Sequence, residues 1–224
     1  MTEKPILFSA PMVRSLLSGA KTQTRRVLKP QPVAGQYAAT YGTAKVDWQV
    51  RSKFGNVISN EKFRWAPGDT LWCRETLTVN GYGLEYAADG ELCHDLFSAD
   101  ANAEAATELW NRRAHVDGAD VHPTSVPSIY MPRWASRITL AVTGVRVERL
   151  QSISEADAMA EGIYWSEDFE GFCSGRGPDE TVDFHQTNPI RSYEKFWDAI
   201  SGNSWDANPW VAVIEFRRME DKQP

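Results

Sequence analysis

Alternation of apolar and polar residues marks several strands along the chain. The runs at 70–74, 138–143 and 145–150 alternate with a period of two, as half-buried strands do. We predict that the last two are paired strands of one sheet. The apolar run at 210–217 predicts the strongest strand, and a short apolar run at 5–9, bounded by proline, predicts an opening strand.

Helical spacing and end signals predict the helices. Proline near the start and Gly19 after the end bound a helix at 11–18. Residues 154–157 read Ser-Glu-Ala-Asp, a variant of the capping box, which predicts a short helix that Gly162 ends. Further helices are expected at 101–114 and from Asn188 to Gly202, and the predicted class is α+β. Residues 29–60 predict a long loop or ragged hairpin, with a possible strand at Val46–Val50.

The run from Gly19 to Arg26 is too polar for a core and follows a predicted helix directly. It carries an amine, two hydroxyls, an amide and two guanidinium groups. In a strand, its even-numbered and odd-numbered side chains would lie on opposite faces. A turn or bulge near Lys21 is therefore needed to bring Lys21 and Thr24 together. The alternative is a solvated face with no chemical role.

The spacing of Gly19, Lys21, Thr22, Thr24 and Arg26 at the end of an N-terminal helix resembles the signature of the ASCH domain family, a branch of the PUA-like β-barrels. This resemblance implies a PUA-like barrel with short flanking helices. Small bacterial members of the family hydrolyse N4-acetylcytidine, and their motif supplies a lysine and a threonine to the active site.

Three other blocks support the resemblance less specifically. Gly68-Asp69 forms a turn before a hydrophobic strand, as in these barrels, and 210–217 resembles their closing strand. The order of strand, turn and short helix across 138–161 resembles the segment with the family's catalytic glutamate, and Glu161 falls on that position. The chain then resembles a larger, phage- or prophage-type member, a single domain over 1–224 with insertions at about 80–128 and 163–187.

Carried over to this chain, the resemblance implies amide hydrolysis. Thr24 would be the nucleophile, Lys21 the base and Glu161 the acid. A free lysine has a pKa near ~10.4, so Lys21 needs burial or a neighbouring cation, such as Arg25 or Arg26, to act as a base. A glutamate in the last turn opposes the helix dipole, so Glu161 there asks for another reason, such as a functional one. The alternative is an exposed glutamate on a surface helix. Groups kept for chemistry add little stability, so substitutions here should barely change the thermal midpoint.

Candidate substrate-binding residues come from two segments. Thr22, Arg25 and Arg26 belong to the motif. In the second segment arginines alternate with aromatic residues, so that Trp134 could stack a base while Arg133 and Arg137 pair with phosphates. The alternative is a packed tryptophan covered by arginine stems.

Charge is distributed unevenly. The net charge is −6, yet residues 4–46 contain no acidic residue and carry the basic residues Lys4, Arg14, Lys21, Arg25, Arg26, Lys29 and Lys45. This pattern would steer a phosphate-bearing ligand to the motif alone. With no apolar run long enough for a membrane and no Cys-x-x-Cys pair, we expect a cytoplasmic protein without membrane contact. The scattered histidines are expected at the surface, and no metal or cofactor is predicted.

The expected partner is a modified nucleoside or single-stranded RNA. Two other function classes stay open. One is a non-catalytic module that binds RNA or a modified base, which a PUA-like barrel commonly supports. The other is a ribonuclease of ASCH type, in which Lys21 and the arginines would contact phosphate. Resemblance of fold cannot choose among these.

Overall fold

The computed structural model describes residues 3–29, 31, 37–42, 45–51, 57–62, 64–117, 120–174, 186–202 and 204–219. Helices and sheets are mixed within these ranges, so the predicted α+β class is confirmed. The helices are α1 (Ala10–Leu17), α2 (Ala103–Arg113), α3 (Glu155–Ala160) and α4 (Pro189–Ser201), with 3₁₀ turns η1 (Ser128–Tyr130), η2 (Arg133–Ala135) and η3 (Leu150–Ser152). No helix in this part of the chain is long and apolar enough to cross a membrane.

The largest sheet has five strands, in the order β1-β6-β13-β16-β2. β1 runs parallel to β6, and the other neighbours are antiparallel. Among the described strands none joins β1 to β2, so the sheet stays open there and forms no closed barrel. The Arg26 side chain bridges the two outer strands, because its Nη2 donates to the Leu7 carbonyl oxygen at 2.5 Å. The strands are β1 (Glu3–Leu7), β6 (Thr70–Arg74), β13 (Thr139–Arg149), β16 (Trp210–Arg218) and β2 (Gln23–Val27).

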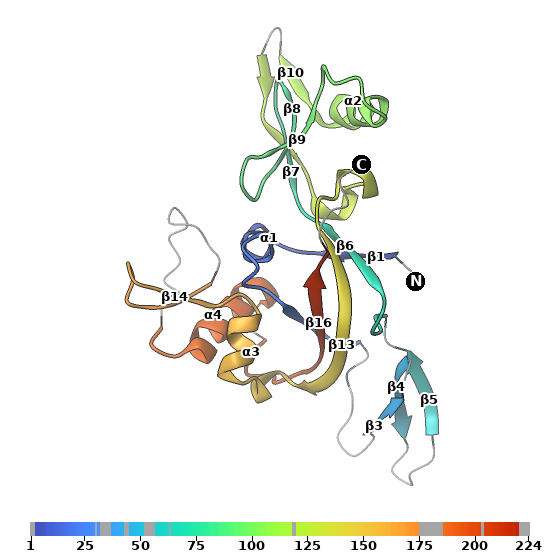
Figure 1. The fold of residues 1–224 in the computed structure, drawn as a ribbon, viewed down its shortest axis with the longest axis vertical. Coiled ribbons are helices and arrows are strands. Elements are labelled where there is room, and N and C mark those ends of the chain that lie inside the picture. The colour runs from blue at the N-terminus through green and yellow to red at the C-terminus, as the bar shows by residue number, and fades with distance from the viewer. Residues whose placement is uncertain are drawn as a thin grey trace.

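The prediction of two paired strands at 138–143 and 145–150 is wrong. These residues form the single strand β13, which pairs with β16 along most of its length (Figure 1). The register shifts between Val142 and Gly144, which is how a β-bulge appears. Gly144 therefore marks a bulge inside a strand, and the alternation on either side of it belongs to the same strand.

Helices α1, α3 and α4 lie together on one side of this sheet (Figure 1). α1 ends before Gly19, whose φ is +78°, and α4 ends at Gly202, whose φ is +72°. The Asn188 side chain caps α4 by accepting hydrogen bonds from two backbone N–H groups of its first turn. The sheet and the helices share one apolar core, which includes Phe8, Leu16, Leu71, Leu140, Tyr193, Trp197 and Ile214.

A second unit extends from the end of the main sheet, at the top of Figure 1. It contains α2, the hairpin β10–β11 and a sheet in the order β12-β7-β8-β9. The predicted insertion at about 80–128 falls within this unit. The strands are β7 (Leu77–Val79), β8 (Gly83–Tyr86), β9 (Leu92–Asp95), β10 (His115–Asp117), β11 (Asp120–His122) and β12 (Thr124–Val126), and the separate core consists of Leu77, Val79, Leu84, Tyr86, Ala106, Val126, Met131 and Ala135.

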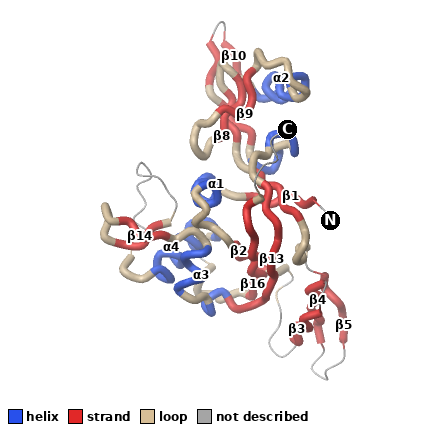
Figure 2. The backbone as a smooth tube through the Cα atoms, viewed as in Figure 1, coloured by secondary structure: helices blue, strands red, loops and turns tan. Residues whose placement is uncertain are grey.

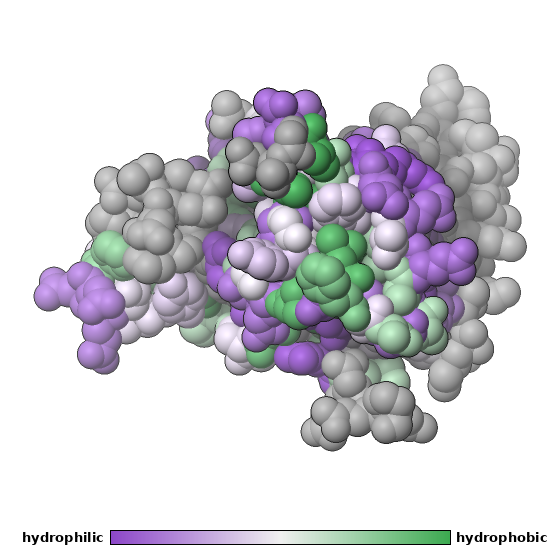
Figure 3. All heavy atoms as spheres, turned by 90° about the horizontal axis from the view of Figure 1, so that it is seen from above, coloured by the Kyte–Doolittle hydropathy of each residue, from purple (hydrophilic) through white to green (hydrophobic). Residues whose placement is uncertain are grey.

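Seen from the end that carries this unit, the surface has a hydrophobic patch among hydrophilic residues (Figure 3). Exposed large apolar residues of the unit include Leu92, Phe97, Val116 and Ile129.

Two smaller sheets complete the described fold (Figure 2). The first has the order β3-β4-β5, and β4 contains the strand predicted at Val46–Val50, which is confirmed. The second is the pair β14–β15, in the segment predicted as the insertion at 163–187, of which residues 175–185 lie outside the described ranges. The strands are β3 (Tyr37–Gly42), β4 (Lys45–Arg51), β5 (Val57–Lys62), β14 (Tyr164–Ser166) and β15 (Gly171–Cys173).

Candidate functional site

The fold brings Lys21 and Glu161 into direct contact, although they lie 140 positions apart. The Lys21 ammonium donates to Glu161 Oε2 at 2.7 Å and to the Glu161 carbonyl oxygen at 2.8 Å. The side chains are 0% and 2% exposed. Burial lowers the pKa of Lys21 below its ordinary value, and the nearby Glu161 charge opposes that shift only in part.

Backbone contacts at the end of α3 fix this pair. Lys21 donates its backbone N–H to the Ser15 carbonyl oxygen of α1, and it forms an isolated antiparallel bridge with Glu161. Gly162 follows with φ of +103°, and a Cβ there would lie 2.9 Å from the Ser15 side chain. A glycine is therefore required where α3, α1 and the motif converge.

Lys21 also explains why a glutamate can stand at this helix end. The last carbonyl groups of a helix carry partial negative charge, which disfavours a carboxylate. The Lys21 ammonium lies at that end and binds both the Glu161 carbonyl oxygen and its carboxylate. The unfavourable position noted in the sequence is thus compensated by one cation.

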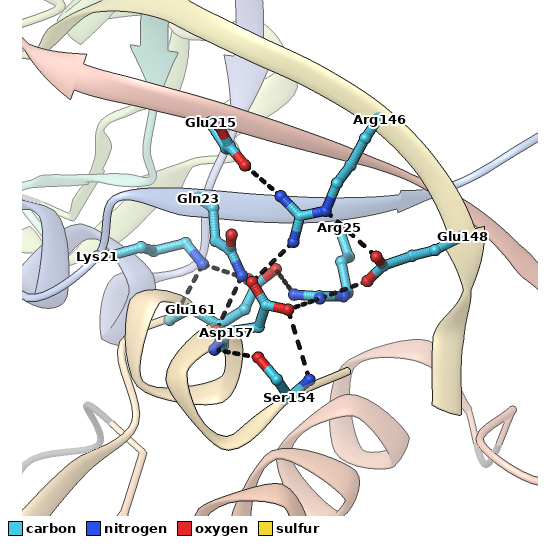
Figure 4. Close-up of polar contacts among 9 residues, drawn as sticks. All are labelled: Lys21, Gln23, Arg25, Arg146, Glu148, Ser154, Asp157, Glu161 and Glu215. Atoms are coloured by element: carbon cyan, nitrogen blue, oxygen red, sulfur yellow. Dashed lines mark hydrogen bonds and ion pairs between the residues drawn. The ribbon is translucent and has the colours of Figure 1, made fainter. Parts of the chain in front are cut away.

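Arg25 holds the other oxygen of Glu161 (Figure 4). Its Nη1 donates to Glu161 Oε1 at 3.1 Å, while Nη2 donates to Glu148 Oε1 at 2.6 Å. Asp157 of α3 lies 3.4 Å from the same Nη2. The Arg25 side chain is 0% exposed, and its Nε has no partner among the described residues. Arg25 therefore ties β2 to β13, to Asp157 of α3 and to Glu161, which caps the end of that helix.

An outer layer of charges surrounds Arg25. Arg146 of β13 pairs with Glu148, Asp157 and Glu215 (Figure 4). Burial raises the pKa of Asp157, but the hydrogen bond with Ser154 and the charges of Arg146 and Arg25 outweigh it and lower that pKa to about 2. The capping residues of α3 are thus locked to the sheet by charge.

A cavity of about 160 Å³ lies beside this cluster. Four consecutive residues of β2 line it, from Thr24 to Val27, together with Glu161. α1 contributes Met12, and α4 supplies most of the opposite wall, namely Tyr193, Phe196, Trp197, Ile200 and Ser201. The cavity is therefore apolar on the α4 side and polar along β2.

Thr24 is buried at 1% exposure and lines the cavity. Its hydroxyl has no hydrogen-bond partner in the described part of the chain. Lys21 and Arg25 contact Glu161 at the end of α3, and Gln23 contacts Asp157 within it, as odd-numbered residues of one extended segment that continues into β2. The Lys21 ammonium is engaged by Glu161, so the structure brings Thr24 and Glu161 to one cavity and pairs Lys21 with Glu161, without a direct Lys21–Thr24 hydrogen bond.

The remaining motif residues have different positions. The Thr22 side chain is exposed, and its backbone N–H donates to the Ala160 carbonyl oxygen. Arg26 lines the cavity, and its guanidinium lies 5.3 Å from the centre of the Phe8 ring. Thr22 thus joins β2 to α3 through the backbone, while Arg26 stays at the site.

The predicted base-binding segment lies elsewhere. Trp134 packs on the core of the second unit, with its ring 5.9 Å from that of His94. Arg133 pairs with Glu3, and Arg137 pairs with Glu75. None of these three residues lines the cavity at Thr24. The structure does not bring Arg133, Trp134 and Arg137 to the motif; it matches the packing alternative for Trp134.

The expectation that all histidines are exposed is wrong for His94. This residue is buried at 6% exposure, and its Nε2 lies 3.1 Å from an Asp100 carboxylate oxygen. Within the described ranges, no three histidine, cysteine or acidic side chains gather as a metal site would require.

Sequence reasoning missed Tyr193, Glu148 and Arg146. The available signal for Tyr193 is that it carries the one aromatic hydroxyl among the apolar residues of the helix expected from Asn188 to Gly202. Comparison of the chain with protein-family models, curated proteins and solved structures finds no match. The ASCH resemblance therefore rests on the motif residues and their arrangement.

Proposed function

We propose that this protein is an amidohydrolase that removes the acyl group from the exocyclic amine of N4-acylated cytidine or a related modified nucleoside. The observation that carries this proposal is the buried ion pair of Lys21 and Glu161. Lys21 Nζ lies 2.7 Å from Glu161 Oε2, beside a cavity that Thr24 and Glu161 line. Burying charges is costly. Three buried charged groups, Lys21, Arg25 and Glu161, beside a cavity therefore favour a catalytic role over a packing role. The substrate class rests on the ASCH resemblance of the motif.

In this mechanism Thr24 attacks the acyl carbon and Lys21 takes its proton. Glu161 protonates the departing amine. Both roles require the neutral form of the pair, a lysine amine beside a protonated carboxyl group. Moving one proton from Lys21 to Glu161 across the 2.7 Å hydrogen bond produces that form, and burial of Lys21 favours the transfer by lowering the lysine pKa.

Proton balance closes over the two steps. When the C–N bond breaks, Lys21 has gained a proton and Glu161 has lost one, which restores the ion pair and leaves an acyl ester on Thr24. Water then attacks this ester, giving one proton to Glu161, while Lys21 returns its proton to the Thr24 oxygen. The carboxylic acid leaves, and the neutral pair is restored. Thr24 must turn toward Lys21 in the complex, as catalytic hydrogen bonds often tighten only with substrate.

The size of the cavity supports a small group as the part that enters. Pockets for drug-sized ligands measure about 300–1,000 Å³, whereas this cavity measures about 160 Å³. The acylated amide end of a nucleoside is of suitable size, and the ribose would remain outside. A single strand of RNA would contribute only the modified base.

We propose that the main sheet, although open between β1 and β2, is related to the PUA-like barrels of ASCH type. The chain order supports this assignment, because the motif leads into β2 and the Gly68–Asp69 turn leads into β6. We also propose a cytoplasmic location, which the free thiols of Cys73, Cys93 and Cys173 support.

Thr24→Val tests the proposal. Release of cytidine and acetate from N4-acetylcytidine is measured, and the variant is expected to lose on the order of 10³-fold or more of kcat/KM. Its thermal midpoint should not fall, since the hydroxyl has no protein partner to lose. Thr78→Val in β7 of the second unit is the matched control and should keep full activity.

Full activity in Thr24→Val would overturn the assignment of the nucleophile. Single-stranded RNA is tested in parallel at two salt concentrations. Strongly salt-dependent binding without turnover of the acylated nucleoside would replace the enzyme with a binding module. Cleavage of the RNA that is lost in Lys21→Ala would replace it with a ribonuclease.

A further inference from the structure

Tyr193 is the most deeply buried polar aromatic residue of the main core. It is 1% exposed, although it lines the cavity from the α4 side. Its ring is held by Phe196, Trp197 and Trp205 at centroid distances of 6.1–6.4 Å. The Arg25 guanidinium lies 5.9 Å from the ring centre. The ring is thus fixed in one position next to the charged cluster.

The Tyr193 hydroxyl has no hydrogen-bond partner among the described residues. Buried tyrosine hydroxyls usually find one, and Tyr86 of the second unit does, since it donates to the Ala135 carbonyl oxygen at 3.0 Å. Neither the Tyr193 nor the Thr24 hydroxyl is among the fully buried unpaired atoms, because both residues line the cavity. These are two hydroxyls without a protein partner at one cavity, where an occupant can bind them.

The β2 wall adds unpaired backbone groups. β2 is the outer strand of its sheet among the described strands. The Leu28 N–H donates to Trp210, and the Thr22 carbonyl accepts from Phe216, so even-numbered residues face β16. In an antiparallel ladder the pairs alternate, so the N–H and C=O groups of Arg25 and Val27 point away from β16. Since both residues line the cavity, its polar wall is a free strand edge.

We propose that this cavity binds a planar amide edge-on along β2, and that Tyr193 selects it by donating a hydrogen bond to the amide carbonyl oxygen. The inference rests on the proposed function, since an N4-acylcytosine is such an amide. The strand edge offers a donor and an acceptor side by side, which is how extended peptides add to a sheet. An unacylated amine lacks the carbonyl oxygen and would leave the Tyr193 hydroxyl unpaired.

The environment keeps Tyr193 a donor. Burial raises its pKa well above the ordinary value, and the Glu161 charge adds to this effect, so the hydroxyl stays protonated across the working pH range. Tyr193 is thus a substrate-binding residue that discriminates between acylated and free bases, while Thr24 carries out the attack.

The test compares Tyr193→Phe with Tyr86→Phe, two buried tyrosines that lose only a hydroxyl. Binding of N4-acetylcytosine and of cytosine is measured by calorimetry, and kcat/KM is measured with N4-acetylcytidine. Tyr193→Phe should weaken N4-acetylcytosine binding about tenfold, the value of one net hydrogen bond. It should leave cytosine binding and the thermal midpoint unchanged. Tyr86→Phe should lower the thermal midpoint, because it leaves the Ala135 carbonyl unpaired, and keep wild-type affinity.

The outcomes separate the two proposals. Hydrolysis by the wild-type protein with unchanged affinity and kcat/KM in Tyr193→Phe overturns the role of Tyr193 and leaves the amidohydrolase standing. Weaker N4-acetylcytosine binding in Tyr193→Phe, without hydrolysis by the wild-type protein, supports the amide site and overturns the hydrolase. Equal weakening for cytosine overturns the carbonyl contact. A wild-type protein that neither binds nor hydrolyses the acylated base overturns both.

Discussion

Two arginines, the buried Arg25 and the partly buried Arg137, each hold several carboxylates, one beside each core of the protein. Arg25 pairs with Glu161, Glu148 and Asp157. Arg137 pairs with Glu75, Asp89 and Glu91. Sequence alone gave both arginines the same role, since each was expected to bind substrate. Their surroundings differ in the groups left without partners.

The Arg137 cluster is fully paired. All three guanidinium nitrogens of Arg137 bind carboxylates, and the guanidinium lies 3.7 Å from the centre of the Tyr86 ring. The Tyr86 hydroxyl has its own acceptor. Such a cluster ties strands and loops of the second unit together and has nothing left to offer a ligand.

The Arg25 cluster is incompletely paired. Within the part of the chain that the structure describes, Arg25 Nε is a buried atom without a partner, and the Thr24 and Tyr193 hydroxyls lie at the cavity without a protein hydrogen bond. Lys21 adds a second buried cation to Glu161. The two hydroxyls open to the cavity distinguish this cluster, as a candidate binding site, from the ion pairs of Arg137. The comparison teaches that an arginine cluster indicates a functional site when polar groups beside it have no partner in the protein.

Glu161→Gln is expected to give the largest effect. The substitution leaves Lys21 and Arg25 as buried cations with one neutral acceptor oxygen between them. Breaking a buried ion pair costs about 3–5 kcal/mol. Urea unfolding at neutral pH measures this loss, and the N4-acetylcytidine assay should show no turnover.

This result would correct the expectation from the sequence that substitutions here barely change the thermal midpoint. That expectation assumed that groups kept for chemistry add little stability, whereas the side chains of Lys21 and Glu161 are 0% and 2% exposed and removing one charge leaves the other unpaired. A variant with wild-type stability and no turnover would instead show that Glu161 acts in catalysis and adds little to stability.

The pH dependence of stability should show the Asp157 contribution next. Its pKa is about 2 in the folded protein, against 3.8 for the free group. A folded pKa below the unfolded one gives stability that is present above the unfolded value and lost as the pH falls toward the folded value. The contribution is about 2 kcal/mol. Wild-type protein should exceed Asp157→Asn by this amount at neutral pH, and urea unfolding should show the difference shrinking between pH 4 and 2.

Elements with strong local signals could be predicted from the sequence. The capping box at Ser154 and the glycines at 19, 162 and 202 act within one helix turn, so the ends of α1, α3 and α4 follow from neighbouring residues. Gly144 was misread because glycine suits both a turn and a bulge. Only the pairing of β13 with β16 shows that the strand continues through it.

The site was predictable only in part. The pairing of Lys21 with Glu161 was expected from the motif, and the fold places them together. The partners of Arg137 were not, because Glu75 lies 62 positions away and nothing local links them. For Tyr193, helical periodicity reports only which face of its helix is buried. It does not report whether a buried hydroxyl has a partner.

Glu75→Gln completes the comparison and should have the smallest effect. Burial raises the pKa of Glu75, and the Arg137 hydrogen bonds oppose this shift only in part, so its charged form is already disfavoured there. A neutral glutamine avoids that cost and keeps one carbonyl oxygen for Arg137, which retains Asp89 at 2.8 Å and Glu91 at 3.0 Å. The expected loss is about 1 kcal/mol in urea unfolding, with unchanged turnover of N4-acetylcytidine. Because this variant makes the same chemical change as Glu161→Gln at the other arginine, loss of turnover in both would show that the two clusters are coupled. Loss of turnover only in Glu161→Gln would locate the chemistry at the incompletely paired cluster.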